Sequence, residues 1–379
     1  MQERYHGTNI DGHTLEELYV RNKNLNDIIG NFSFPGAIYY LFTGQEPTSS
    51  QEELLDRFLA SSLSSLKEND PVLEIIPTVI NSGATFSQGI IAGLMVDQTK
   101  SFEKTIATFD LDAIGLDRDS QIGLYYVGLI PLLMTIAIES IESLDGKRFK
   151  LPLVKKDYVE ALFTLCTNRT FIDSTERKIF NDVMVSFHGG CGFLPPTVML
   201  PRVASSTRVP MSQAIAAGFT AGGPAHVGAC ERAMEFFTTL YKHCSGDLET
   251  EAIEFLEEQL ANKKKISGFG HPMFKVDPRN IRLRAILSEV GMQSDFLKIY
   301  DLTAQLLKDK FGIYPNIDGI TAAIFLSLGI KPKYGTGLFL CSRTSAMVAH
   351  ILEQKSKPPF GASSEEIRKW FGPFAVGID

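Results

Sequence analysis

Apolar residues recur at intervals of three and four along most of this chain, which is the spacing of one face of an α-helix. The clearest series is Val227, Cys230, Met234, Phe237 and Tyr241. The same spacing marks residues 16–19, 35–42, 52–66, 122–143, 158–165, 252–260, 281–290, 296–308, 320–328 and 338–352. Strand-like alternation is scarce, and no succession of βαβ units is visible. The pattern therefore predicts an all-α protein.

Breaks rich in glycine and proline separate these helical segments and mark the expected loops. They fall at residues 189–196, 222–224, 268–272 and 355–364. No break is long enough for a free linker, and the sequence contains no internal repeat. A second domain, if present, must therefore be inserted into the first.

The longest apolar run, residues 122–138, has the composition of a buried helix rather than of a membrane span. It contains Gly123, Gly128 and Pro131, and it is short for crossing a bilayer. We expect it to lie in the core or in a subunit interface. Residues 1–6 lack the apolar centre of a signal peptide. These features predict a cytoplasmic protein that has no membrane partner.

Composition narrows the possible partners and bound groups. Of the 379 residues, 44% are apolar and 21% are charged, which is typical of a globular protein. The net charge of −7 argues against nucleic acid as a partner, so an anionic substrate would need a local cluster of positive charge. The five cysteines are scattered and form no CxxC pair, so we expect neither a disulfide framework nor a metal site.

Three short segments place a histidine or an aspartate beside glycine and proline, and the first of them carries His226. Gly222, Gly223 and Pro224 precede an amphipathic pattern, and proline favours the first position of a helix. His226 is therefore expected in the first helical turn, where the helix dipole would keep its imidazole neutral and able to donate a hydrogen bond. The alternative is a histidine that only caps or packs at a helix start.

The second segment places His271 after a Gly-Phe-Gly turn, in which the backbone can come close to whatever the imidazole faces. Six residues later, Asp277 and Pro278 have the pattern of an N-cap and a first helical residue. Arg279 then falls in the first turn, where a positive charge opposes the helix dipole, so we expect it to bind an anion. The alternative is a surface arginine paired with Asp277.

The third segment holds Asp318 just before an apolar helix, between Pro315 and Gly319. An aspartate in this place is often an N-cap, and this interpretation stays open beside that of a catalytic base. A base would need partial burial, which raises the pKa of a carboxyl toward the working pH.

Three further residues lie in apolar or glycine-rich surroundings. Arg343 lies in the apolar segment 338–352 and needs an anionic partner, which is either a structural carboxylate or a substrate carboxylate. His188, beside two glycines, could add a hydrogen bond to the same anion. His350 has no such setting, and we expect a hydrogen-bonded histidine of the core.

Together these segments resemble the citrate synthase family. Gly223-Pro224-Ala225-His226 is similar to the segment whose histidine polarises the thioester carbonyl of acetyl-CoA. The segment of His271 and Arg279 is similar to the one that meets the carbonyl and a carboxylate of oxaloacetate. Asp318 corresponds in the resemblance to the base that removes the methyl proton.

The resemblance extends over most of the chain. Ser342-Arg343-Thr344 is similar to the family's second carboxylate-binding arginine segment, and His188 is similar to an additional oxaloacetate histidine. Residues 34–48 are similar to an amino-terminal family segment. The resemblance implies a large helical domain, residues 1–226 and 330–379, interrupted by a small helical domain, residues 227–329. It places the active site in the cleft between them and implies a homodimer.

The chain departs from the family pattern at three places. The first catalytic histidine continues as Val227-Gly228-Ala229-Cys230, and His188 stands between Phe187 and Gly189 instead of between aspartate and glutamate. The arginine-bearing carboxy-terminal motif is absent, since residues 354–379 offer only Lys355, Lys357, Arg368 and Lys369. One carboxylate contact to the oxo-acid is therefore unaccounted for.

The implied reaction is a Claisen-type condensation of an acyl-CoA with a 2-oxo dicarboxylate, followed by thioester hydrolysis. Four lysines are candidates for binding the CoA phosphates: Lys263, Lys264, Lys265 and Lys275. A run of lysines can also be an ordinary solvated surface. No permanently bound cofactor is needed. Two other interpretations stay open: a citryl-CoA lyase, and a catalytically silent relative that binds CoA or a partner.

Overall fold

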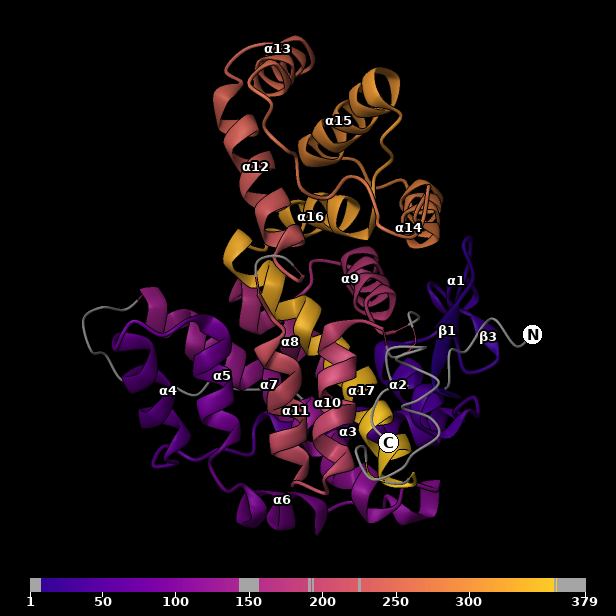
Figure 1. Ribbon diagram of the computed structural model, residues 1–379, viewed down its shortest axis with the longest axis vertical. Coiled ribbons are helices and arrows are strands. Elements are labelled where there is room, and N and C mark those ends of the chain that lie inside the picture. Colours follow the sequence, from indigo (N-terminus) through magenta and orange to yellow (C-terminus); the bar gives the residue numbers. More distant parts are fainter. Residues whose placement is uncertain are drawn as a thin grey trace, which may run out of the picture.

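The computed structural model describes residues 8–142, 157–189, 194–223 and 226–357, together with Gly192 and Pro359. Within these residues the fold is almost entirely helical (Figure 1), which confirms the predicted all-α class. The elements are β1 (Asp11–His13), β2 (Leu18–Val20), β3 (Lys23–Asn24), α1 (Leu25–Ile28), α2 (Phe34–Thr43), α3 (Ser49–Leu63), α4 (Val72–Asn81), α5 (Phe86–Leu94), α6 (Thr99–Ile106), η1 (Asp112–Ile114), α7 (Arg118–Glu142), α8 (Tyr158–Thr167), α9 (Ser174–Ser186), α10 (Pro196–Ser206), α11 (Met211–Thr220), α12 (Ala229–His243), α13 (Leu248–Ala261), α14 (Pro278–Glu289), α15 (Asp295–Phe311), α16 (Ile317–Ser327), η2 (Pro332–Tyr334) and α17 (Gly335–Lys355).

The helix expected at residues 16–19 is wrong, because this part of the chain forms a small antiparallel sheet in the order β1-β2-β3. Asp11 pairs with Val20 and His13 with Leu18, and the backbone N–H of Thr14 donates to the carbonyl of Glu17 at 2.9 Å to close the turn. Four residues are too few to distinguish helical from strand periodicity.

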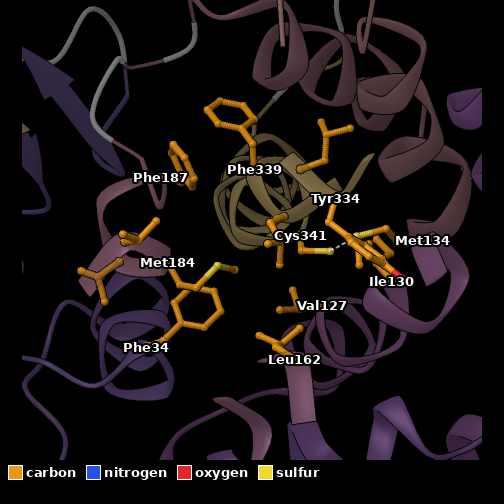
Figure 2. Packing of buried hydrophobic residues seen from close by; sticks show 14 of the residues in the cluster. Phe34, Val127, Ile130, Met134, Leu162, Met184, Phe187, Tyr334, Phe339 and Cys341 are labelled. Carbon is orange, nitrogen blue, oxygen red and sulfur yellow. Dashed lines mark hydrogen bonds between the residues drawn. The ribbon is translucent and has the colours of Figure 1, made fainter. Parts of the chain in front are cut away.

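Helix α7 forms the centre of the core. It is long and apolar enough to cross a membrane by length and composition alone, yet 89% of its apolar window is buried inside the fold. Figure 2 shows Val127, Ile130 and Met134 of α7 facing Cys341 of α17, whose Sγ lies 3.7 Å from Met134 Sδ. The expected core helix is confirmed, and its burial within one chain leaves it unsuited to a subunit interface.

Helices α12 to α16 gather on one side of the molecule, at the top of Figure 1, and the remaining helices form the larger body below. After α16 the chain returns through α17, which packs against α7 and α10 in the body. Helices α14 and α16 pack on α9, and α14 also contacts α1. The three predicted segments lie where these two groups of helices meet.

Candidate functional site

The second and third glycine- and proline-containing segments pair with each other although more than forty residues separate them along the chain. The backbone N–H of Gly270 donates to the carbonyl of Tyr314 at 2.8 Å, and that of Asn316 donates to the carbonyl of Gly268 at 3.0 Å. The Asn316 side chain adds a 2.6 Å hydrogen bond to the carbonyl of Gly270. This pairing brings the turn of His271 against the start of α16.

Asp318 lies in the first turn of α16 and does not cap the helix. Asn316 is the N-cap, and its Oδ1 accepts from the backbone N–H of Asp318 at 2.9 Å and of Gly319 at 3.3 Å. The alternative of Asp318 as an N-cap is therefore wrong. Across the described ranges, the Asp318 carboxylate has no hydrogen bond or ion pair within the protein. It is thus available to a ligand.

Burial raises the pKa of Asp318 to about 6. The positive charges of Arg279 and Arg343 oppose this rise, and the negative charge of Asp277 adds to it. A carboxyl with this pKa is mostly ionised at pH 7 and yet accepts a proton more readily than an exposed aspartate. Its position and its pKa suit a proton acceptor.

His271 has one ring nitrogen occupied by the turn that carries it. Its Nδ1 accepts from the backbone N–H groups of Met273 and Phe274, both at 3.1 Å. In the neutral ring the proton is therefore assigned to Nε2, which becomes a hydrogen-bond donor. Burial lowers the pKa of the half-buried His271; the negative charge of Asp277 opposes this, and the charges of Arg279 and His13 add to it.

Asp277 and Arg279 form a buried ion pair at the start of α14. Arg279 Nε and Nη2 donate to the two carboxylate oxygens of Asp277 at 3.0 and 2.8 Å. Asp277 caps α14 through the N–H of Arg279, and Pro278 is the first helical residue, as predicted. The alternative of a surface arginine is wrong, because only 4% of Arg279 is exposed. Burial raises the pKa of Asp277, but the charge of Arg279 brings it below its usual value.

The same carboxylate also connects α14 to α16. Asp277 Oδ2 accepts from the backbone N–H of Ile317, the first residue of α16, at 3.0 Å. The turn of His271, the start of α14 and the start of α16 are thereby held as one unit. The turn of His271 is therefore held at a fixed position relative to Asp318 by hydrogen bonds to the backbone, and not by side-chain packing alone.

His226 lies in a turn just before α12, and the expectation that it occupies the first helical turn is wrong. The helix begins at Ala229 with Gly228 as its N-cap, while Pro224 and Ala225 lie outside the described residues. The partly exposed ring of His226 has its Nε2 3.3 Å from Thr197 Oγ1 of α10. Burial and, to a smaller extent, the charge of Arg343 lower its pKa.

The positive charge of Arg343 in α17 acts on residues of both the first and the third segment. Its guanidinium is 4% exposed, donates from Nε to the carbonyl of Phe187 at 3.3 Å and lies 5.1 Å from the centre of the Phe339 ring. Its positive charge lowers the pKa of both His226 and Asp318. A buried arginine therefore stands within electrostatic reach of both residues, as expected for segments that converge on one site.

His188 occupies a different environment from the one expected. It is fully buried, its Nε2 lies 3.0 Å from the carbonyl of Ala37, and its Nδ1 lies 2.9 Å from Ser345 Oγ. Burial lowers its pKa to about 4, so the ring is neutral and both nitrogens are used inside the protein. This geometry does not support the expected hydrogen bond to a substrate. His188 instead joins α2 to α17.

His350 is a buried, hydrogen-bonded core histidine, as expected. Its Nδ1 lies 3.1 Å from a guanidinium nitrogen of Arg202, and its Nε2 lies 3.2 Å from Asp11 Oδ1. The candidate lysines are all exposed: Lys263, Lys264 and Lys265 directly follow α13, and Lys275 lies between His271 and Asp277.

Three residues near this site were missed by sequence reasoning. Asn316 directly precedes the helix, so its N-cap role was readable from its residue type. Arg232 of α12 donates to Ser267 Oγ at 3.4 Å, and its charge acts on Asp318. His13 of β1 acts on the pKa of His271. No local pattern indicates the last two: Arg232 lies on an exposed helix face typical of any surface arginine, and His13 is distant in sequence from His271.

A cavity of about 710 Å³ borders the turn that carries His226. Its lining residues include Gly222 and Gly223, which precede His226 in the sequence, and Gly228 and Arg232, which follow it. The volume falls in the range of small-molecule sites. Within the residues that the structure describes, no group of three or more histidine, cysteine, aspartate or glutamate side chains could hold a metal ion.

Comparison with known proteins identifies the family. A family model described as "Citrate synthase, C-terminal domain" matches residues 4–361, and the chain therefore belongs to the citrate synthase family. A citrate/2-methylcitrate synthase of Bacillus subtilis (strain 168) is 25% identical over 348 residues, which cover 89% of this chain and 86% of that relative. A 2-methylcitrate synthase of Corynebacterium glutamicum is 24% identical over 352 residues, covering 89% and 85%.

Solved structures share the fold. The citrate synthase of Thermotoga maritima MSB8 superposes with a TM-score of 0.69 at 20% identity, covering 98% of this chain and 94% of that one. That of Thermoplasma acidophilum gives a TM-score of 0.71 at 19% identity, covering 94% and 92%. Family membership places the chain among transferase-type enzymes that condense an acetyl-CoA-like unit with oxaloacetate.

Proposed function

We propose that this protein condenses an acyl-CoA with oxaloacetate and then hydrolyses the thioester, with Asp318 as the base. The observation that carries this proposal is the Asp318 carboxylate, which is left free by the Asn316 cap and has a pKa of about 6. A carboxylate of this kind removes a proton from the carbon next to the thioester. The citrate synthase relatives support the substrate class.

His226 stabilises the enol or enolate that this proton transfer produces. Its lowered pKa favours the neutral imidazole near pH 7. The N–H group of this neutral ring donates a hydrogen bond to the thioester oxygen. A donor placed where negative charge develops lowers the barrier most. His226 therefore acts in the first chemical step, together with Asp318.

His271 acts on the second substrate. The Nε2–H group, fixed by the two backbone hydrogen bonds to Nδ1, donates to the keto oxygen of oxaloacetate. The enol carbon attacks the keto carbon, and the resulting alkoxide takes up a proton at this donor. Water then cleaves the thioester, and the products are the tricarboxylate and free CoA.

Arg343 and Arg279 supply the positive charge for the carboxylates of oxaloacetate, since arginine suits carboxylate recognition better than lysine. Arg279 shares its charge with Asp277, so Arg343 carries the larger part of this task. His188 is left out of this set because both its ring nitrogens are bonded inside the protein.

The exposed lysines are proposed contacts for the CoA phosphates. The ion pair of Lys298 with Glu249 joins the first turns of α15 and α13, and that of Lys310 with Glu257 joins their later turns, so the two helices run in the same direction.

The carboxy-terminal ends of α13 and α15 therefore lie on the same side. Lysines 263–265 follow α13 at this end, and the chain continues from the same end of α15 to Asp318. Lys275 lies four residues from His271.

We propose that residues 227–329 are a small domain inserted into a large one, residues 1–226 and 330–379, with the site between them. The grouping of α12 to α16 supports this division (Figure 1). A homodimer is also proposed, with α10 and the residues just before it at the interface. Leu194, Leu200 and Val203 are 43%, 38% and 44% exposed there. Neighbouring exposed apolar side chains of this kind mark protein interaction surfaces. The cytoplasmic location stays a prediction.

The solved Thermoplasma acidophilum enzyme is a ternary complex with carboxymethyl coenzyme A and oxaloacetate, which supports testing this substrate pair. Purified protein is incubated with acetyl-CoA or propionyl-CoA and oxaloacetate, and free thiol is followed. We expect thiol release that requires both substrates, and the ratio of kcat/KM values identifies the acyl group. Cleavage of citryl-CoA without thiol release, or inactivity toward a panel of acyl-CoAs and oxo-acids, contradicts the proposal.

A further inference from the structure

The turn that follows α9 is held against α17 close to Arg343. Arg343 Nε donates to the carbonyl of Phe187 at 3.3 Å, and Ser345 Oγ lies 2.9 Å from Nδ1 of His188. The rings of Phe187 and Phe339 meet edge to face, with centres 4.9 Å apart (Figure 2). All five residues are buried. Because a backbone carbonyl of the turn accepts from Arg343, the direction of the guanidinium depends on where the turn lies.

Asp11 of β1 fills the space beside the same turn at Gly189, the residue after His188. A Cβ atom on Gly189 would lie 2.7 Å from Asp11 Oδ2, so a side chain could enter only if the buried carboxylate moved. Gly189 is itself buried and does not have a positive φ, so this close approach, and not the backbone conformation, requires the glycine. Asp11 is also near enough for its negative charge to oppose the burial that lowers the pKa of His188. The Asp11 carboxylate therefore packs directly on the turn.

The second carboxylate oxygen of Asp11 connects the same side chain to α17. Asp11 Oδ1 lies 3.2 Å from Nε2 of His350, which stands about two helical turns further along α17 than Arg343. The guanidinium of Arg202 can only donate, so His350 Nδ1 accepts from it at 3.1 Å and the ring proton is assigned to Nε2. Asp11 is thus the acceptor for His350. One buried carboxylate contacts both the turn and the helix that together determine the position of Arg343.

We propose that Asp11 is a positioning residue for oxo-acid binding, whose carboxylate sets the distance between the turn and α17 and thereby directs the Arg343 guanidinium toward a carboxylate of oxaloacetate. This inference rests on the proposed function, in which Arg343 carries the larger part of carboxylate binding. A group that holds a substrate loses much of its effect when it is displaced by about 1 Å, so loss of the spacing should weaken oxaloacetate binding. Asp11 itself touches no substrate and acts only through the turn and the helix.

The first test compares Asp11→Ala with Glu353→Gln. Glu353 belongs to the same buried network, since it forms a 2.6 Å ion pair with Arg202 and accepts from the backbone N–H of Asn9 at 2.7 Å, but it lies about three helical turns beyond Arg343. Both changes should lower the Tm, because each removes a partner from buried polar groups. Titration calorimetry should show a Kd for oxaloacetate that rises about fivefold or more in Asp11→Ala and stays within twofold of wild type in Glu353→Gln. The KM for the acyl-CoA should stay within twofold in both.

The second test changes Gly189. Gly189→Ala keeps every charge in place but pushes the Asp11 carboxylate away, so it should also raise the Kd for oxaloacetate. Gly189→Asp should weaken binding in the wild-type background, where two carboxylates would compete for one space. In the Asp11→Ala background that space is empty, and Gly189→Asp should improve binding because it returns a carboxylate to nearly the same place. This reversal of sign is not expected of a merely structural role.

A Kd for oxaloacetate within twofold of wild type in Asp11→Ala overturns the inference, as does an equal rise in Glu353→Gln. A Gly189→Asp change that fails to improve binding by the Asp11→Ala protein overturns it as well. If Asp11→Ala does not fold, Gly189→Ala decides, and an unchanged Kd in that variant contradicts the role of Asp11. Wild-type protein that does not bind oxaloacetate contradicts the proposed function itself, so the two failures are distinguishable.

Discussion

Gly268 and Gly319 approach so closely that a Cβ atom on Gly268 would lie 2.6 Å from the Cα of Gly319. This contact joins the turn before His271 to the first turn of α16. Gly268 also has a φ of +89°, a conformation that other residues adopt only with strain. The spacing between His271 and Asp318 therefore depends on the absence of a side chain at this position.

The change Gly268→Ala is expected to lower the free energy of unfolding by at least about 3 kcal/mol, because left-handed strain adds to a backbone clash. Gly291→Ala is the matched control, since Gly291 has a φ of +67° and a Cβ there would meet no atom within 4 Å. It should cost about 1 kcal/mol through strain alone. Urea unfolding measures both, and equal losses would show that the close approach is unimportant.

Replacement of Asn316 by alanine should affect both stability and turnover. It removes the N-cap of α16, at a cost of about 1 kcal/mol, and the 2.6 Å hydrogen bond to the carbonyl of Gly270. We expect a lower Tm and a lower kcat, because the two paired segments separate. Ser294→Ala removes the N-cap of α15 and is the control. It should lower the Tm similarly and leave kcat within twofold; a comparable kcat loss there would argue against a specific role for Asn316.

Local sequence patterns predicted most helices and the start of α14. Asp277 and Pro278 occupy the N-cap and first helical positions because these preferences depend only on nearby backbone groups. The pairing of residues 268–271 with 314–319 could not be predicted, because it joins distant parts of the chain without any periodic signal. The effect of His13 on His271 could not be predicted for the same reason, because the two residues are far apart in the sequence.

The placements of His188 and His226 differ from expectation for related physical reasons. His188 stands beside glycines, which suggested an open site, but its buried ring contacts the carbonyl of Ala37 in α2 and Ser345 in α17. His226 was placed in a helix because its glycines and proline resemble a helix start, whereas α12 begins three residues later. Composition alone does not reveal which way a loop folds or where the first helical hydrogen bond forms.

The pH dependence of kcat/KM should follow the ionisation of Asp318 in the free enzyme. Since burial raises the pKa of Asp318 to about 6, activity should fall tenfold per pH unit below about pH 6. Burial lowers the pKa values of His226 and His271 from their ordinary values, which favours the neutral imidazoles that the mechanism requires. Initial rates at limiting substrate between about pH 4.5 and about pH 8 test this. A midpoint near that of an ordinary aspartate would exclude a buried base.

The raised pKa of Asp318 also has a consequence for stability. A carboxyl that binds its proton more tightly in the folded state than in the unfolded state destabilises the fold as pH rises from the unfolded value of 3.8 to the folded value of about 6. Asp318→Asn removes this charge and should raise the free energy of unfolding at about pH 8 by on the order of 3 kcal/mol. The gain should vanish below about pH 4. A variant that is less stable than wild type at about pH 8 would contradict this account of the carboxylate.

The most direct test of the mechanism is free-thiol release by wild type and Asp318→Asn with an acyl-CoA and oxaloacetate both saturating. The proposed role of Asp318 predicts release that needs both substrates and a kcat that falls by about 10²–10⁴ in the variant, whose fold is intact by circular dichroism. A folded Asp318→Asn protein that turns over within tenfold of wild type would show that another group removes the proton.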